Sequence, residues 1–234
     1  MKKGRIDAAW KGLAQCQDCG IRDLVLFADL AEPDFNLIHL PIDEIEFDIG
    51  ATIYSEGDDA GALFTIRTGL AKLVQHLPDG SQRIVRLLRH GATAGLEATL
   101  GQPYQHTAVA LQPILACRIP RQVVERLNEE TPRLHGQLIR RWASALRQAD
   151  DWLTELSTGK APQRLARLLL QLSDGDNTVM LFSREDLGSI LGITTEHASR
   201  TVAEFRRAGH LVEIGANLFR CDRRQLENVA SGPA

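Results

Sequence analysis

The stretch SREDLGSILGITTEHASRTVAEFRRAGHL, from Ser183 to Leu211, is the most informative part of this sequence of 234 residues. Ser183 and Asp186 form an S-x-x-D pattern, which is typical of a helix start because both side chains can bond the free backbone N–H groups there. The apolar residues that follow are Leu187, Ile190 and Leu191. We therefore predict a short amphipathic helix at the beginning of the stretch.

A second helix is predicted directly after the first. Gly192 ends the first helix, since glycine readily adopts the left-handed conformation of a helix terminus, and Thr194 can cap the second. The buried face of the second helix is formed by Ala198, Val202 and Phe205. Two short helices joined by a short turn that contains glycine are typical of a helix-turn-helix. A helical hairpin that serves only in packing is the alternative.

Polar side chains at the start of the second helix are the candidate DNA contacts. Arginine can bond guanine O6 and N7 together, glutamate can accept from cytosine N4, and serine can contact a phosphate or a base edge. We predict that the contacts come from Thr194, Thr195, Glu196, His197, Ser199 and Arg200. From Lys160 onward, ten Lys and Arg face nine Asp and Glu, so charge alone does not indicate DNA binding.

The flanks of this stretch agree with a winged helix-turn-helix. Before it we predict a helix over PQRLARLLLQLSDG and a strand over TVMLF, and after it two strands in HLVEIGANLFRC around a Gly-Ala-Asn turn. Cys221, on the last strand, is interpreted as a small buried hydrophobic residue. Gly159 and Pro162 in STGKAP disfavour a continuous helix, which predicts a domain boundary there.

Further toward the N-terminus, a long helix is predicted over residues 131–157. Its apolar residues recur at spacings of four and three: Leu134, Leu138, Trp142, Ala145, Ala149, Trp152 and Leu156. Such a heptad-like seam must be buried. We predict a homodimer in which two copies of this helix pair through Leu138, Trp142, Ala145, Ala149 and Trp152. The alternative is that the seam packs on its own domain.

Residues 42–120 show short apolar alternations, such as IEFDIGATIYSEG and LFTIRTGLAKLVQHL, divided by glycines at intervals near ten residues. This pattern is typical of a small antiparallel barrel or sandwich, and LPDGSQ predicts a hairpin turn. The formal net charge of -3 and the 44% apolar residues exclude a disordered chain or a polycation. No signal peptide or membrane-spanning run is apparent, so we expect a cytoplasmic protein. The sequence contains none of the common catalytic motifs, so we expect no enzyme.

The order of barrel, long helix and winged helix-turn-helix resembles the Crp/Fnr family of bacterial transcription regulators. The segments LGITTEHASRTVAEF and LFTIRTGLAKL carry the resemblance. It implies an α+β chain with a cysteine-bearing segment and a helix at 1–40, a cyclic-nucleotide-binding-like antiparallel β-barrel at 41–130, a dimerisation helix at 131–158 and a winged helix-turn-helix domain at 160–234. The E-x-x-S-R pattern of Glu196, Ser199 and Arg200 implies a TTGAT-type half-site. RNA polymerase is implied as a partner.

The resemblance also bears on the ligand. The cyclic-AMP-binding branch holds the phosphate with an Arg-Ser or Arg-Thr pair, and here Gln105, His106 and Thr107 stand in the corresponding segment, after Gly95 and Glu97. A cyclic phosphate would lack its main charge partner, so cyclic AMP is not expected.

Cysteines offer a different sensor. The Fnr branch binds an oxygen-labile 4Fe-4S cluster through three N-terminal cysteines and one in the barrel. The resemblance implies Cys16, Cys19 and Cys117 as ligands, whereas Val25 stands at the third N-terminal position. An oxygen or nitrogen ligand would then complete the set, with Asp18, Asp23, Asp29 and His106 as candidates. The alternatives are a labile cluster, a thiol-disulfide switch, haem, or a vestigial site.

The sequence thus predicts a DNA-binding regulator that responds to oxygen or redox state. Two alternatives stay open: a thiol-redox or haem-based gas sensor of the same family, and a ligand-binding module of cyclic-nucleotide type that does not bind DNA.

Overall fold

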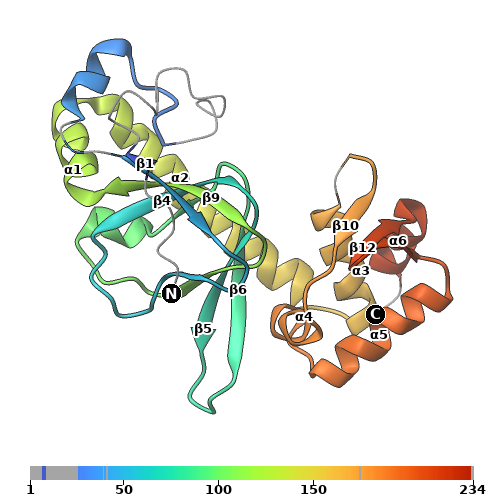
Figure 1. Cartoon of the computed structure of the whole chain (residues 1–234). Coiled ribbons are helices and arrows are strands. Elements are labelled where there is room, and N and C mark those ends of the chain that lie inside the picture. Colours follow the sequence, from blue (N-terminus) through green and yellow to red (C-terminus); the bar gives the residue numbers. More distant parts are fainter. Residues whose placement is uncertain (1–6, 9–25, 39, 41, 174, 233–234) are drawn as a thin grey trace. The chain divides into compact units, whose positions relative to one another are not determined.

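The computed structural model describes residues 7–8, 26–38, 40, 42–173 and 175–232 (Figure 1). Its contacts divide the chain into two compact units. The first comprises residues 1–75 and 86–147, and the second comprises 76–85 and 148–234. The division falls inside the predicted long helix, whereas the sequence predicted a boundary after it.

Two antiparallel sheets form the first unit, except that their hairpin at residues 76–85 is grouped with the second unit. One has the order β1-β2-β9-β4-β7, with β1 at Asp7–Ala8, β2 at Asp43–Phe47, β9 at Ile114–Pro120, β4 at Ala62–Thr68 and β7 at Thr93–Ala94. The other has the order β3-β8-β5-β6, with β3 at Thr52–Tyr54, β8 at Thr107–Ala110, β5 at Ala71–His76 and β6 at Gln82–Leu88. In the described residues no ladder joins the two sheets, so the predicted barrel is a two-sheet sandwich rather than a closed cylinder.

Aromatic side chains fill the space between these sheets. Tyr54 stacks on Tyr104 with ring centroids 3.9 Å apart, and it contacts Phe64 of the other sheet at 5.8 Å. The alternation of apolar residues in the sequence therefore indicates which side chains form the core, because every second side chain of a strand faces the partner sheet. At the turn after β4, Gly69 has φ 84°, and a Cβ there would lie 2.1 Å from the carbonyl oxygen of Pro113. Only glycine fits this turn.

Three short helices and one long helix accompany the sheets in the described part of residues 26–151. They are the 3-10 helices η4 at Glu32–Leu37 and η5 at Leu96–Leu100, followed by α1 at Arg121–Glu130 and α2 at Pro132–Asp151. Residues 26–38 are held by a small apolar core of Leu26, Phe27, Leu30, Phe35 and Ile38, all buried. The rings of Phe27 and Phe35 meet edge to face at 6.5 Å.

The predicted seam is divided between two faces of α2. Leu134, Leu138 and Ala145 are buried within the chain itself. The apolar side chains that α2 exposes are Ile139 at 56%, Trp142 at 36% and Leu146 at 65%. Packing on the chain's own domain, the alternative in the sequence analysis, thus accounts for Leu138 and Ala145. Ala149 and Trp152 are half-buried, and Trp152 begins a π-helical turn, η6, at Trp152–Leu156.

The second unit contains the predicted winged helix-turn-helix. Its helices are α3 at Ala161–Leu172, α4 at Arg184–Leu191, α5 at Thr195–Arg207 and α6 at Arg223–Ser231. Its sheet has the order β10-β12-β11, with β10 at Thr178–Met180, β11 at Leu211–Gly215 and β12 at Leu218–Cys221. The helix after the STGKAP break, the short strand and the two-stranded wing are confirmed. Asn217 turns the wing with φ 55°, a left-handed conformation that asparagine tolerates.

Candidate nucleic-acid interface

The first helix of the motif begins and ends, and the second begins, where the sequence predicted. The Ser183 side chain accepts a hydrogen bond from the backbone N–H of Asp186 at 3.0 Å, and Thr194 accepts one from His197 at 3.2 Å. Gly192 ends α4 in the left-handed conformation, with φ 64°. Each bond satisfies a backbone donor that a helix start leaves open. These three residues therefore set both ends of α4 and the start of α5.

Gly188, inside α4, is a structural residue that the sequence analysis missed. A Cβ at this position would lie 2.7 Å from the carbonyl oxygen of Ile193 and 3.4 Å from the backbone nitrogen of Thr195. Ile193 also donates a backbone hydrogen bond to the Gly188 carbonyl at 3.0 Å. The turn therefore packs directly on the backbone of α4. A glycine inside an otherwise regular helix pattern was the available signal.

The recognition helix α5 has one buried and one exposed face. Ala198, Val202 and Phe205 are buried, as predicted. Glu196, Ser199 and Arg200 are exposed, and their spacings of three and four place them on one side of the helix. Thr194 and Thr195 are also exposed, whereas His197 is half-buried. The exposed face begins at the N-terminal end of α5, which is the end that contacts base edges in such motifs.

Two arginines near α5 form contacts within the described part of the fold, whereas Arg200 does not. Arg206 forms an ion pair with Glu213 of the wing at 2.9 Å and lies 5.9 Å from the ring centre of Phe219. Arg164 of α3 donates to the Leu191 carbonyl at 2.6 Å, at the end of α4. Within the described residues, the Arg200 side chain has no hydrogen bond or ion pair. Arg206 and Arg164 therefore stabilise the fold, and Arg200 is available to a ligand.

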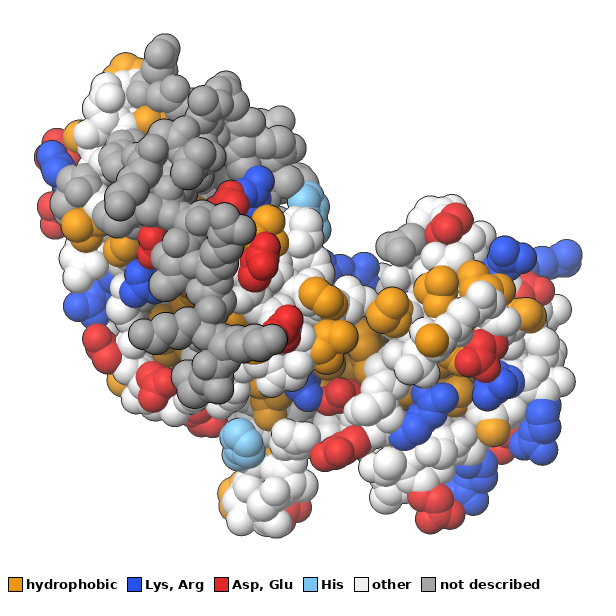
Figure 2. Space-filling view, in the orientation of Figure 1, with side chains coloured by type: hydrophobic (Ala, Val, Ile, Leu, Met, Phe, Trp, Pro, Cys, Tyr) orange, Lys and Arg blue, Asp and Glu red, His pale blue; other side chains and the backbone are white. Residues whose placement is uncertain are grey.

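Charge is mixed on the visible surface of the second unit. Figure 2 shows Lys and Arg side chains gathered around α5, with Asp and Glu among them. Burial lowers the pKa of Arg184, at the start of α4, and the nearby charge of Arg206 lowers it further. A crowded arginine of this kind favours a nearby anion, because an added negative charge relieves the repulsion.

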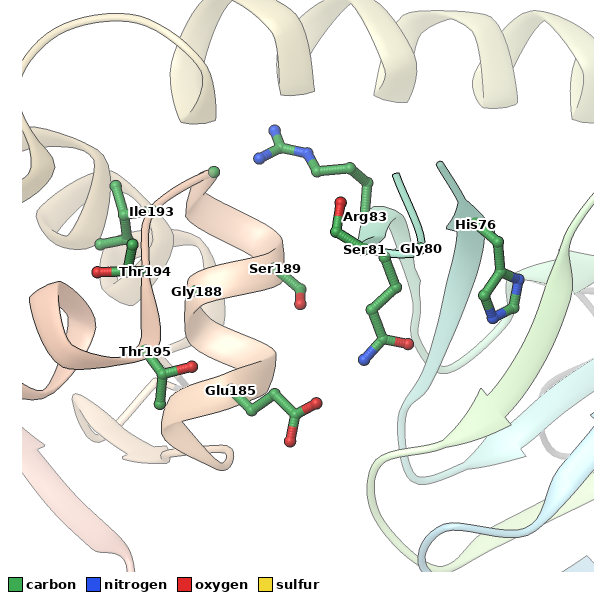
Figure 3. A pocket seen from close by; sticks show the side chains of 12 residues that line it. His76, Gly80, Ser81, Arg83, Glu185, Gly188, Ser189, Ile193, Thr194 and Thr195 are labelled. Carbon is green, nitrogen blue, oxygen red and sulfur yellow. The ribbon is translucent and has the colours of Figure 1, made fainter. Parts of the chain in front are cut away.

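A pocket within the second unit lies beside the turn of the motif (Figure 3). Figure 3 shows Glu185 and Ser189 on one side of α4, with Arg83 and Ser81 of the residues 76–85 opposite them. Of the predicted DNA contacts, only Thr194 and Thr195 line this pocket. The face of α5 that carries Glu196, Ser199 and Arg200 is therefore separate from it.

Loss of the Thr194 cap should destabilise the motif. Thr194→Ala removes the acceptor for the His197 N–H, and such caps contribute about 1 kcal/mol. We expect the free energy of unfolding, measured on the full chain by urea denaturation, to fall by about that amount. Thr194→Ser keeps the hydroxyl and should stay within a few tenths of a kcal/mol of wild type. Equal losses in both variants would contradict a role as a cap.

The first unit contains a second candidate site, in the segment where the resemblance places a nucleotide phosphate. A pocket there is lined by Glu56, Gly57, Gln75, Gln102, Pro103, Tyr104, Gln105 and His106. His106 Nδ1 lies 3.8 Å from the Glu97 carboxylate. Burial tends to raise the pKa of Glu97, but the nearby His106 and, to a smaller extent, the charge of Arg86 outweigh burial and lower the pKa. Arg86, a half-buried cation of this region, is thus already under the influence of the Glu97 carboxylate.

The predicted cluster ligands are only partly described. Cys16, Cys19, Asp18, Asp23 and Val25 lie outside the described residues. Cys117 is half-buried on β9. Asp29 forms an ion pair with Arg140 of α2, and His106 lies next to Glu97 at the other sheet. Across the part of the chain that the structure describes, no group of three or more His, Cys, Asp or Glu side chains could hold a metal ion.

Cys221 agrees with the interpretation as a small hydrophobic residue. It is 5% exposed, and burial raises the pKa of its thiol to about 11. The thiol is therefore protonated at neutral pH and is a poor metal ligand.

Comparison with known families supports the architecture. Residues 44–131 match the model of the cyclic nucleotide-binding domain, and residues 163–229 match that of the Crp-like helix-turn-helix domain. The chain is 26% identical over 232 residues to the transcriptional activator protein anr of Pseudomonas aeruginosa, covering 94% of this chain and 93% of that protein. It is also 26% identical over 224 residues to the fumarate and nitrate reduction regulatory protein of Vibrio cholerae, covering 92% and 90%.

Solved structures give the same result. The structure of FixK2 from Bradyrhizobium japonicum matches with a TM-score of 0.74 and 26% identity, covering 83% of this chain and all of that one. A Crp-family transcriptional regulator from Thermus thermophilus matches with a TM-score of 0.70 and 26% identity, covering 80% and 96%.

An exposed polar face on the second helix of a winged helix-turn-helix, attached to a two-sheet domain and a long helix, defines a DNA-binding transcription regulator. The chain belongs to the Crp/Fnr family. Among the described residues, no helix has the length and apolar content to cross a membrane.

Proposed function

We propose that this regulator binds, as a homodimer, a palindrome of two TTGAT-type half-sites, and that its binding responds to oxygen or redox state. The main observation in support of DNA binding is the exposed face of α5. It presents a carboxylate, a hydroxyl and a guanidinium on Glu196, Ser199 and Arg200, all on one side of a capped helix.

These three side chains suit the bases of such a half-site. A guanidinium can donate two hydrogen bonds to guanine O6 and N7, and a carboxylate can accept from cytosine N4. The Ser199 hydroxyl can bond a phosphate or a base edge. Thr194 and Thr195, at the start of α5, lie where backbone N–H groups and hydroxyls meet a phosphate. His197 is half-buried, so we assign it a smaller part.

The exposed stripe of α2, formed by Ile139, Trp142 and Leu146, supports the dimer. Large apolar side chains in a continuous stripe are unfavourable in water, and a second copy of the same helix would bury them. A two-fold dimer also explains palindromic recognition, since it places two α5 helices in successive major grooves about 34 Å apart. We place the dimer contact on this stripe, with Ala149 and Trp152 at its C-terminal end.

The surroundings of Cys117 fit a group held by thiolates. Cys117 lies opposite Glu44 of β2 on one side and Thr65 of β4 on the other, and Thr65 lies opposite Thr93 of β7. Within the described residues, the hydroxyls of Thr65 and Thr93 are buried without a hydrogen-bond partner. The thiol of Cys117 thus belongs to a polar row that crosses the sheet. Glu44 of this row is already paired with Arg67, and the hydroxyls of Thr65 and Thr93 can donate hydrogen bonds to the sulfur atoms of a bound cluster.

The N-terminal strand leads toward the same row. Asp7 of β1 is paired with Glu44, so β1 lies two strands from Cys117, about 10 Å away. Cys16 stands eight positions after Ala8 in the sequence, and eight extended steps can cover about 27 Å. Cys16, Cys19 and Cys117 would hold a 4Fe-4S cluster, which supplies an oxygen-labile link between the N-terminal segment and the sheet. The fourth ligand stays unassigned, and Asp29 is already paired with Arg140.

The names of two relatives support a response to oxygen or redox state. One is the fumarate and nitrate reduction regulatory protein, and the other is the electron transport regulator A of Shewanella oneidensis. Cyclic AMP is not proposed, because Gln105, His106 and Thr107 stand in the segment where the resemblance implies the phosphate-binding arginine. RNA polymerase is proposed as a partner from the family alone.

Oxygen should weaken DNA binding. We expect protein prepared without oxygen to bind a fluorescent TTGAT-type palindrome about 10-fold more tightly than air-exposed protein, measured by anisotropy at fixed salt. Cys19→Ser and Cys117→Ser should each remove the difference, because a hydroxyl is a poor substitute for a thiolate toward iron. Cys221→Ala, which removes a buried thiol away from the proposed cluster, should keep the difference in affinity between anaerobic and air-exposed protein.

An absorption spectrum of the anaerobic protein separates the alternatives. A broad shoulder in the blue indicates a cluster, a sharp intense band indicates haem, and a flat trace with an air-dependent affinity indicates a thiol switch. Equal affinity with and without air, together with wild-type behaviour of both cysteine variants, would refute the sensing role.

A further inference from the structure

The long helix α2 is tied to the segment at residues 26–38 by two ion pairs. Asp34 accepts from Arg133 Nη1 at 2.9 and 3.2 Å and from the backbone N–H of Ala31 at 2.8 Å. Asp29 forms the other pair, with Arg140. The partners are 99 and 111 residues apart in the sequence. These contacts therefore connect the end of the cysteine-bearing part of the chain to the helix that carries the exposed stripe.

The two arginines lie on one side of α2. They are seven residues apart, which is about two turns and about 10 Å along the axis, with about 20° between their directions. The apolar core of residues 26–38 holds the segment in place, and Asp34 is only 8% exposed. A carboxylate at each end of this span resists rotation of the helix more than one pair would, because the two contacts are separated along the axis.

The faces of α2 have a definite order around its axis. Measured from Arg133 at 100° per residue, the residues buried in the chain, Leu134, Leu138 and Ala145, lie at about 100–140°. The exposed apolar residues Ile139, Trp142 and Leu146 lie at about 180–240°. The ion pairs thus hold α2 from the side opposite the exposed stripe. They leave the stripe uncovered while they set the direction in which it points.

We infer that the Asp34–Arg133 and Asp29–Arg140 pairs form a clasp that fixes the rotation of α2, and that dimer formation depends on this clasp. The inference rests on the proposed homodimer. The segment at 26–38 is docked when both pairs are formed, and the stripe then points outward for a second copy. Loss of the pairs lets α2 turn about its axis and misaligns the stripe. The clasp gives the N-terminal part of the chain control over dimerisation without any contact with the stripe itself.

Asp29 and Arg140 are the better pair for a test, since both side chains are about half exposed and their replacement does not disturb the core. Asp29→Arg and Arg140→Asp should each raise the dimer dissociation constant, measured by analytical ultracentrifugation on the full chain, by about 10-fold. The double variant, in which the charges are exchanged, should return to within about 3-fold of wild type. Arg133→Gln should weaken the dimer at least as much, because it leaves a buried carboxylate with one donor fewer.

Arg147 provides a matched control. It is exposed on the same side of α2, one heptad beyond Arg140, and within the described residues it forms no ion pair with the segment at 26–38. Arg147→Asp should change the dissociation constant by less than about 3-fold. An equal effect of Arg147→Asp, or no recovery in the exchanged double variant, would overturn the clasp. A wild-type chain that stays monomeric would overturn the homodimer itself, which separates the two failures.

Discussion

The variant Leu146→Glu should sediment as a monomer at concentrations at which the wild type is a dimer, and it should bind a two-half-site palindrome about 100-fold more weakly. Leu146 is 65% exposed in the single chain, so a glutamate there is well hydrated in the monomer. In a paired helix it would be desolvated against its own copy, which costs several kcal/mol. Loss of about 2.7 kcal/mol of binding free energy corresponds to the 100-fold effect. Light scattering and anisotropy measure the two quantities on the same samples.

Ile49→Glu is the matched control for this experiment. Ile49 is 66% exposed in the turn between β2 and β3, so it offers the same chemical change at the same exposure away from α2. It should leave the dimer and the DNA affinity unchanged. A dimer that persists in Leu146→Glu would refute the stripe as the contact. The half-buried Ala149 and Trp152 would then be the residues to test next.

The variant Arg200→Ala should bind the specific palindrome about 5- to 150-fold more weakly per half-site, a loss of about 1–3 kcal/mol. The side chain has no partner within the described residues, so its removal should not destabilise the fold. Its two hydrogen bonds to guanine would be lost, and no other side chain of α5 can replace both. The measurement is a pair of titrations, one with the palindrome and one with unrelated DNA at the same salt concentration.

The specificity ratio decides the interpretation of that result. Affinity for unrelated DNA should change little, because a base contact contributes to specific binding only. If both affinities fell equally, Arg200 would be a phosphate contact and the orientation of α5 on DNA would be different. Arg224→Ala, at an exposed arginine of α6, serves as the control for removal of one positive charge from this unit.

Residues 183–211 were sufficient to predict the helix-turn-helix in detail. The caps at Ser183 and Thr194 and the turn at Gly192 act on backbone groups close to them in the chain, so the sequence contains both partners of each contact. The buried face of α5 followed from helical spacing alone. Gly188 was missed because its role depends on how closely the turn approaches α4, and spacing does not report that distance.

The inner and outer faces of the long helix α2 could not be told apart from the sequence. Leu138, Trp142 and Ala145 were predicted to form one seam because they are apolar and recur at spacings of four and three. Such spacings are compatible with a wide apolar face that can include both inward and outward side chains. In the folded chain, Leu138 and Ala145 turn toward their own domain, and Ile139 and Leu146 are exposed instead. A shift of one residue turns a helix by about 100°, so only the packing of α2 against its neighbours can separate the inner from the outer face.

Local sequence thus determined the elements whose contacts are local: the two capped helices, the wing, and the glycine-divided strands of the first unit. The tertiary structure alone decided the features that join distant residues. These are the polar row around Cys117, which needs the register of neighbouring strands, and the pairing of Asp29 and Asp34 with arginines about a hundred residues away. The physical reason is that a charged residue can pair with any opposite charge that the fold brings near. Its sequence neighbours carry no information about which one that is.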